Sequence, residues 1–179
     1  MAEAFINQVN RAVGIVTSSS NASIGIGLTW MSGISTAHVA IHDLVDNANF
    51  IAGTKVTLVG VSSVQLDRAS TNTVTATASN VSFLGPTTSY SSASATKSIL
   101  IGGTFANNTA NSVNLTVTVY DNSAETESQL AAKIPVPTGS SFVISDAGKT
   151  VLEGNDEVRV YCDTENAIDV NLSILKGVS

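Results

Sequence analysis

The two histidines of the chain, His38 and His42, lie four residues apart and are followed by Asp43 and Asp46. Two imidazoles and a carboxylate on one side of an element form a zinc-type ligand set. The run Val39-Ala40-Ile41 favours a strand, which would present both histidines on the same side. No glutamate lies between them, so the metalloprotease motif with its general base is absent. We expect an ordinary surface pair and no metal site.

Nucleophilic chemistry has little support in the sequence. No serine sits in a Gly-x-Ser-x-Gly elbow, and neither histidine has the context of a catalytic triad. The single cysteine, Cys162, precedes Asp163, and an adjacent negative charge raises a thiol pKa and disfavours the thiolate. We expect Cys162 to be a core residue at a strand end. One cysteine also excludes an internal disulfide and a multi-thiolate metal site.

Acidic residues gather in three groups without the Asp-x-Asp-x-Asp-Gly spacing of a calcium loop. Solvated turns are the favoured interpretation, and a weak calcium site is the alternative. Glycine-rich phosphate loops are also missing, so we expect no catalytic residue, no cofactor and no enzymatic activity. The groups are Asp121, Glu125 and Glu127; Glu153, Asp156 and Glu157; and Asp163 and Glu165.

The composition is poor in charge and rich in small polar side chains. Only 12% of the 179 residues are charged, with a net charge of -6, against roughly 25% charged residues in an average protein. Because the chain is acidic and has no Lys/Arg cluster, we expect it to bind neither nucleic acid nor an anionic membrane. No apolar run approaches 18 residues, and Met1 to Ala4 lacks the positive region of a secretory signal, so a soluble, unprocessed chain is expected.

Short β-branched runs, separated by turn residues, dominate the chain after Gly14. The clearest is Val113 to Tyr120, which is apolar at every second position and so favours a half-buried strand. The predicted class is all-β, with a small β-barrel or β-module plus an antiparallel β-sandwich, and a short N-terminal helix or arm. The other predicted strands are 55–61, 63–67, 73–84, 98–106, 141–145, 157–162 and 167–175.

The N-terminal segment has the apolar spacing of one helix face. Twelve residues make a marginal helix, so the segment either packs on its own protein or is an arm that contacts a neighbouring subunit. Trp30 is likewise either a core residue or an anchor for another chain. The candidate interface residues are Phe5, Ile6, Val9, Val13 and Trp30.

Pro86 to Lys97 is the most hydroxyl-rich stretch and is our candidate domain boundary. The expected organisation is an N-terminal arm or first strand over 1–19, a small β-module over 20–86, and a β-sandwich over 90–179. Residues 12–17 fit either part. If they pair with the sandwich, the module is an insertion into it.

Two turn motifs organise the second half. The Pro-x-Pro-x-Gly run from Pro135 to Gly139 predicts that a strand ends and the chain reverses. Gly154-Asn155-Asp156 predicts a hairpin between Val151-Leu152 and Val158-Arg159-Val160.

Two segments carry resemblances that together cover about four-fifths of the chain. The run Ile51 to Val56, followed by Val64-Gln65-Leu66 and Thr71-Asn72-Thr73, resembles a small β-module with an I-x-x-G-T-x-V pattern, common in phage and bacterial surface proteins. In this chain one residue, Ala52, separates Ile51 from Gly53 where the pattern has two. Asp43-Leu44 stands where that module has Gly before Val. The second half resembles a β-sandwich domain of tailed-phage virion proteins, especially those of cyanophages. Its motifs include Ile99 to Gly103, Ala106 to Thr109, Ile134 to Pro137, Gly139 to Ser141, Val151 to Asp156 and Val170 to Leu175.

These resemblances imply a non-enzymatic virion protein, first of all a capsid decoration or cement protein on the head exterior. Its implied partners are the major capsid protein, other virion proteins and further copies of itself, after synthesis in the host cytoplasm. Low charge and Ser/Thr/Asn-rich faces suit wet protein interfaces. The alternatives are a neck, tail or fibre-associated component, or a carbohydrate- or host-surface-binding adhesin using Tyr90, Tyr120 or Tyr161.

Overall fold

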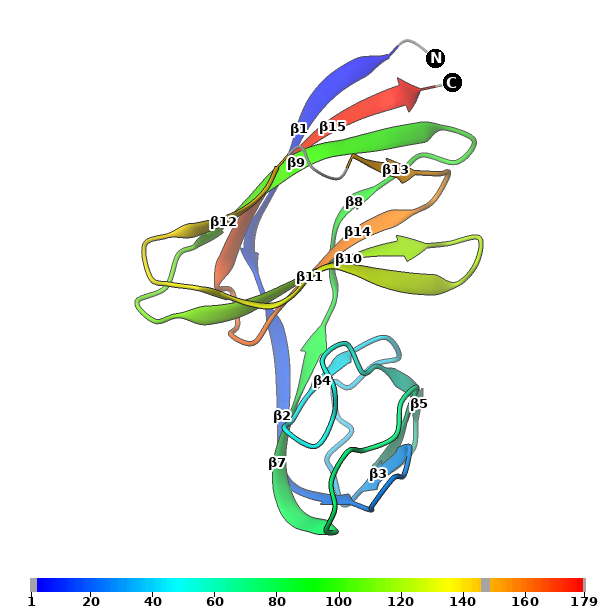
Figure 1. Cartoon of the computed structure of the whole chain (residues 1–179), viewed down its shortest axis with the longest axis vertical. Helices are drawn as coiled ribbons and strands as arrows, with labels where there is room; N and C mark the ends of the chain where they lie inside the picture. The colour runs from blue at the N-terminus through cyan, green and yellow to red at the C-terminus, as the bar shows by residue number, and fades with distance from the viewer. Residues whose placement is uncertain (1–2, 146–148, 179) are drawn as a thin grey trace. The chain divides into compact units, whose positions relative to one another are not determined.

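The structure, a computed structural model, describes residues 3–145 and 149–178. All regular elements in these residues are β-strands (Figure 1), which confirms the all-β prediction. Accordingly, the described residues contain no helix long and apolar enough to cross a bilayer. The run Asp146-Ala147-Gly148, whose composition predicts a turn, lies outside the described residues.

Contacts divide the chain into two compact units. Residues 1–14 and 87–179 form one, called here the sandwich unit, and residues 15–86 form the other, called the inserted unit because its sequence interrupts that of the first. The sequence predicts an N-terminal part that ends at residue 19. Residues 15–19 belong instead with the inserted unit, because Ile15 to Ser19 pair with Val81 to Gly85.

The sandwich unit has two antiparallel sheets, seen as separate layers in Figure 1. In both, apolar side chains at alternate positions point inward, and the shared core includes Phe105, Leu115, Val160 and Leu172. The first sheet has the order β1 (Ala4–Val13), β15 (Ile168–Val178), β9 (Lys97–Asn107), β12 (Ser141–Ile144), with β13 (Thr150–Leu152) also pairing with β9. The second has the order β11 (Thr126–Val136), β10 (Val113–Asp121), β14 (Glu157–Cys162), β8 (Thr87–Ser91).

The inserted unit is one six-stranded sheet whose two edges meet. The Val45 N–H donates to the Thr54 carbonyl at 2.8 Å, and the Val56 N–H donates to the Asp43 carbonyl at 2.9 Å. These bonds join the edge strands and give the sheet a barrel-like closure around its own core, which includes Met31 and Phe83. The order is β4 (Leu44–Asp46), β7 (Ala76–Gly85), β2 (Ile15–Ile24), β3 (Trp30–Ser32), β6 (Ser63–Leu66), β5 (Val56–Val59).

The N-terminal helix expected from the apolar spacing is wrong, because the described part of this segment is strand β1, paired antiparallel with β15. Ile6, Gln8 and Asn10 alternate with the exposed residues Phe5 and Val9. Two polar residues on the less exposed side hid the two-residue period in the sequence. Pairing with a long partner strand overrides a weak helical pattern.

The predicted boundary over Pro86 to Lys97 contains strand β8 rather than a linker. Its hydroxyls are used inside the fold: Ser92 and Ser98 are buried and lie 3.1 Å apart through their Oγ atoms. Ser92 also donates to the carbonyl of Thr96 at 3.0 Å. Hydroxyl-rich sequence is therefore compatible with packed structure here, because local hydrogen bonds satisfy the side chains.

The hairpin predicted around Gly154-Asn155-Asp156 is also wrong. Val151 on β13 pairs with Ile99 of β9, whereas Val158 on β14 pairs with Val119 of β10 and Tyr90 of β8. The turn therefore carries the chain from one sheet to the other. Turn composition signals a change of direction, but it does not fix which strand becomes the hydrogen-bonded neighbour.

Candidate interaction surfaces and polar sites

The five candidate interface residues are divided between surface and core. Phe5 is 77% exposed and Trp30 is 45% exposed. Val9 is also exposed, on the same side of β1 as Phe5. Ile6 packs against the sandwich core and Val13 belongs to it, so these two stabilise the unit itself.

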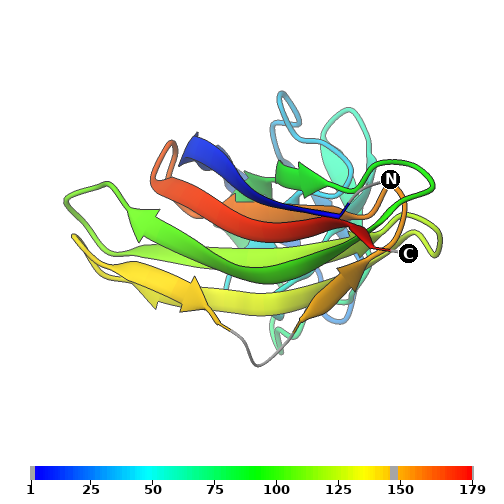
Figure 2. The same cartoon turned by 90° about the horizontal axis from the view of Figure 1, so that it is seen from above.

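An apolar row crosses the outer face of the first sandwich sheet. Phe5 pairs with Leu175, Leu175 with Ile99, and Ile99 with Val151, which is 54% exposed. Figure 2 shows the strands that carry the row side by side. With strands about 4.8 Å apart, the row is about 14 Å long. On each strand one chain neighbour of the row residue lies in the core or packs against it, so the row faces away from the core; these neighbours are Ile6, Ile174, Leu100 and Leu152.

The inserted unit carries a shorter apolar surface around Trp30. Trp30 pairs with Gln65, and Gln65 pairs with Leu58, so the two apolar side chains flank an amide across three strands. The adjacent residue Met31 is fully buried. The core position of this strand is therefore taken by Met31, which leaves Trp30 on the outer face.

The strand expected to carry the histidines is absent. His38 and His42 occupy successive turns, closed by the bonds Val39 N–H to Thr36 O at 3.1 Å and Asp43 N–H to Ala40 O at 3.3 Å. Both have positive φ, 66° and 78°, a conformation in which histidine is enriched among non-glycine residues. Among the described residues, no three His, Cys, Asp or Glu side chains lie together as a ligand set for a metal ion.

Several of the clustered carboxylates hold turns together. Asp121 accepts from the backbone N–H groups of Ser123 and Ala124, each at 2.9 Å, which lowers the pKa of Asp121. Buried Asp156 accepts from the N–H groups of Asn122 at 3.1 Å and Glu153 at 2.8 Å. These bonds explain why acidic residues recur at the strand ends.

Cys162 and Asp43 are buried and have raised pKa values. Burial raises the pKa of the Cys162 thiol to about 11, with the charge of Asp163 acting in the same direction. Cys162 ends β14 inside the core, as the sequence predicted. Burial also raises the pKa of Asp43, although the Ala40 N–H and the nearby His42 oppose the shift. The environment of Cys162 disfavours the thiolate, and the Asp43 carboxylate accepts from the Ala40 N–H at 2.8 Å.

A polar cluster that the sequence analysis missed lies on the face of the second sheet opposite its core side chains. The Tyr161 hydroxyl donates to Glu127 Oε1 at 2.9 Å, and Thr118 donates to the same oxygen. Arg159 Nε lies 2.7 Å from Glu157 Oε2. Burial and the neighbouring Glu127 raise the pKa of Tyr161. The signal in the sequence was the alternation from Glu157 to Tyr161, which places polar side chains on one face.

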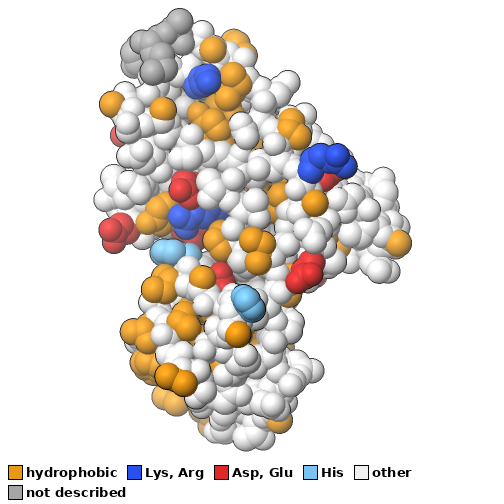
Figure 3. All heavy atoms as spheres, turned by 180° about the vertical axis from the view of Figure 1, so that it is seen from behind, with side chains coloured by type: hydrophobic (Ala, Val, Ile, Leu, Met, Phe, Trp, Pro, Cys, Tyr) orange, Lys and Arg blue, Asp and Glu red, His pale blue; other side chains and the backbone are white. Residues whose placement is uncertain are grey.

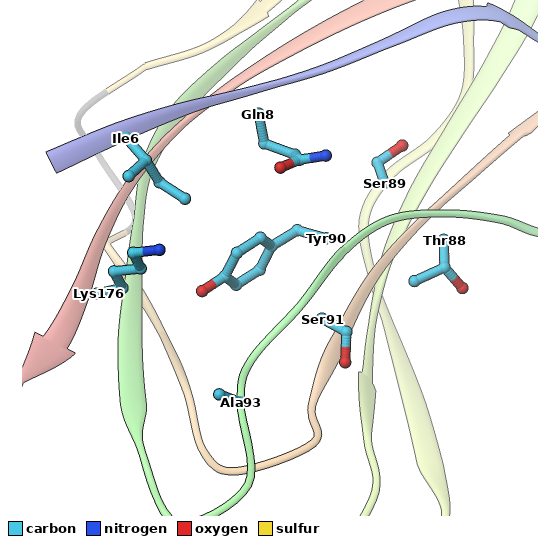
Figure 4. Close-up of a pocket in the computed structure, with 8 residues that line it drawn as sticks. All are labelled: Ile6, Gln8, Thr88, Ser89, Tyr90, Ser91, Ala93 and Lys176. Atoms are coloured by element: carbon cyan, nitrogen blue, oxygen red, sulfur yellow. The ribbon is translucent and has the colours of Figure 1, made fainter. Parts of the chain in front are cut away.

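A groove of about 380 Å³ opens between the edge strands of the two sandwich sheets. Ile6 and Gln8 of β1, Ser89 and Tyr90 of β8, and Lys176 of β15 contribute to its lining (Figure 4). Of the three tyrosines considered for an adhesin site, only Tyr90 lines this groove. Tyr120 and Tyr161 belong to the polar cluster around Arg159.

The surface agrees with the low charge of the sequence. On the face drawn in Figure 3, charged side chains are few, and hydrophobic ones lie among backbone and uncharged polar side chains. The chain matches no protein-family profile, no curated protein and no solved structure.

Proposed function

We propose that this protein is a non-enzymatic structural component of a tailed-phage virion, and specifically a decoration or cement protein on the exterior of the head. The observation that carries the proposal is the apolar row formed by Phe5, Leu175, Ile99 and Val151 on the outer face of the first sandwich sheet. The virion setting comes from the sequence resemblance. The proposed partner of this face is the major capsid protein, and repeated copies add avidity.

The mixed character of the face supports an interface with another folded protein. Four residues further along β1, Val9 pairs with Asn171, and Asn171 pairs with Thr104, which in turn pairs with Val143. The second row is therefore polar at its centre and apolar at its ends. Apolar contacts interleaved with hydroxyl and amide groups are typical of protein interfaces that retain bridging water.

The experiment is localisation of the protein in intact particles, followed by substitution in the apolar row. Cryo-electron microscopy of the particle should show density for the two units on the head surface. Density confined to the neck, tail or fibres would overturn the head assignment in favour of that alternative. Phe5→Ser and Val151→Ser should each reduce occupancy on the head severalfold, because each removes apolar contact area.

Val61→Ser is the matched control for Val151→Ser. Val61 is 96% exposed and lies in the inserted unit, outside the row. Its substitution should leave occupancy unchanged. Far-ultraviolet circular dichroism should be the same for all three variants. Equal loss of occupancy in Val61→Ser and Val151→Ser would refute a specific role for the row.

A further inference from the structure

The groove between β1 and β8 contains a buried hydroxyl without a partner. Tyr90 pairs with Val158 and Thr88 pairs with Arg159, so Ser89 is the extra residue of a β-bulge. Ser89 is 1% exposed, and its Oγ makes no hydrogen bond with the described residues. A buried unsatisfied hydroxyl is costly, and bulges often re-aim a side chain beside a binding site. The Ser89 hydroxyl therefore has hydrogen-bonding capacity that the described residues do not use.

The opposite wall, on β1, adds amide groups. Gln8 lines the groove, and Asn10 lies two residues further on the same side of the strand. Asn10 Oδ1 is also buried without a hydrogen-bond partner among the described residues. Figure 4 shows Gln8 and Ser89 at one end of the groove, with the ring of Tyr90 between them and Lys176. Donors and acceptors from two strands thus surround an aromatic ring.

The Tyr90 ring is fixed in position and amphipathic. Its hydroxyl lies 2.8 Å from Ser98 Oγ on β9, and its ring packs against the sandwich core. Ile6 supplies a second apolar group in the lining. An aromatic face next to hydroxyl and amide groups suits a ligand that has C–H groups on one face and hydroxyls at its rim.

The charge of the groove is opposite to that of the protein. Lys176 is exposed and is the only charged residue in the lining, which holds no carboxylate, whereas the whole chain has a net charge of -6. A cation at one end of a groove without acidic groups favours an anionic ligand. A volume of about 380 Å³ lies within the usual range of small-molecule sites.

We propose that this groove binds an acidic sugar residue, a hexuronate at an accessible position of a polysaccharide. The pyranose C–H groups pack on Tyr90, the ring hydroxyls bond to Gln8 and Ser89, and the carboxylate pairs with Lys176. This inference goes beyond the structural role proposed above and does not depend on it, since it concerns a groove of the sandwich unit rather than the outer face of its first sheet.

The test is to titrate the protein separately with methyl glucuronide, methyl glucoside and acetate. Binding is monitored through the aromatic NMR signals of Tyr90. We expect saturable shifts with glucuronide at millimolar concentrations, weaker binding of glucoside, and no shift with acetate. Lys176→Gln should weaken glucuronide binding about tenfold, as expected for a lost charge-assisted bond. The same variant should leave glucoside binding unchanged.

Ser89→Ala should weaken the binding of both sugars. It should not destabilise the fold, because it removes a hydroxyl that has no hydrogen-bond partner among the described residues. Ser173→Ala and Lys149→Gln, which change exposed residues outside the groove, are the matched controls and should bind like the original protein. No shift with either sugar up to tens of millimolar would overturn the proposal. So would equal shifts with acetate and glucuronide, or glucuronide binding that is insensitive to Lys176→Gln.

Discussion

The guanidinium carbon of Arg159 lies 3.8 Å from the ring centroid of Tyr120. The two residues are diagonal neighbours, since Arg159 on β14 pairs with Thr118 and Tyr120 on β10 pairs with Glu157. Arg159 therefore reaches across the strands to place its charge over the ring, while its Nε bonds to Glu157 at 2.7 Å. Burial by itself lowers the pKa of Arg159, but Glu157 and Glu127 outweigh it and raise the pKa.

Replacing this arginine should destabilise the sandwich unit. Arg159→Met keeps much of the apolar stem but removes the cation from Glu157 and from the Tyr120 ring. We expect a loss of about 1–3 kcal/mol in the free energy of unfolding. All three tyrosines lie within residues 87–179, so near-ultraviolet circular dichroism during urea unfolding, measured in a Trp30→Phe background to remove the indole signal, reports on this unit.

Arg68→Met is the control for Arg159→Met. The Arg68 side chain is 45% exposed, and its Nε lies 3.8 Å from Asp67. Its loss should change stability by no more than about 0.5 kcal/mol. Trp30, the lone tryptophan, lies in the inserted unit with Arg68 and reports by fluorescence. Similar small effects of both substitutions would show that the Arg159 cluster adds no more than a surface pair.

Tyr161 should resist ionisation in alkali. Burial and Glu127 raise its pKa above the ordinary value of 10. Tyrosine ionisation is followed by absorbance at 295 nm. At pH 11, the folded original protein and folded Tyr161→Phe should therefore show the same increase in absorbance, and the two proteins should differ only after unfolding. Because only the unfolded phenol ionises near its ordinary pKa, the original protein should lose stability above about pH 10 relative to the variant. A smaller increase in absorbance for folded Tyr161→Phe than for the folded original protein would show that Tyr161 ionises in the folded state, and would contradict its raised pKa.

Strand positions were predictable where one side of a strand is apolar without interruption. Val113 to Tyr120 is such a run, and its odd-numbered residues from Val113 to Val119 are buried as expected, but Thr116 and Thr118 on the opposite face are buried as well, so the strand is not half-buried as predicted. β1 was not predictable, because Gln8 and Asn10 lie on the same side of the strand as Ile6. These two polar residues broke the two-residue apolar period. In the structure, Gln8 lines the groove, and Asn10 has a buried Oδ1 atom without a hydrogen-bond partner among the described residues.

Pairing partners were less predictable than strands. The sequence around Gly154 looks like a hairpin, yet β13 and β14 pair in different sheets. Local composition encodes the turn, whereas the choice of sheet depends on which long strand offers a free edge. The Arg159 cluster was missed for a related reason, because Glu127 and Arg159 are 32 positions apart and meet only through the β11-β10-β14 order.

Asp43 should make the stability of the inserted unit depend on pH. Its folded pKa is raised above 3.8, so the ionised form opposes folding. The unit should gain stability as pH falls through the folded pKa, with the full gain below the unfolded pKa. Asp43→Asn keeps an oxygen for the Ala40 N–H but removes the charge. At pH 7 the Asp43→Asn variant should have a higher free energy of unfolding than the original protein, and the difference should become smaller as the pH is lowered. Unfolding is measured by Trp30 fluorescence.

Asp121 is the internal comparison for Asp43 in a carbon-13 NMR titration of carboxyl groups. Hydrogen bonds from Ala124 and Ser123 lower the pKa of Asp121, so its midpoint should lie below 3.8 and that of Asp43 above it. A midpoint for Asp43 at or below that of Asp121 would refute the burial argument.

Gly14, the last residue of the first sandwich segment, should tolerate no side chain. Its φ is +138°, and a Cβ atom there would lie 2.1 Å from the backbone oxygen of Thr164. Gly14→Ala should cost about 2 kcal/mol or more, detected in the tyrosine signal of the sandwich unit. Gly139, in the same unit, also has positive φ, but no atom lies within 4 Å of its Cβ position. Gly139→Ala should therefore cost only the backbone strain, about 1 kcal/mol. Equal losses for the two variants would mean that the close approach of Thr164 relaxes without cost.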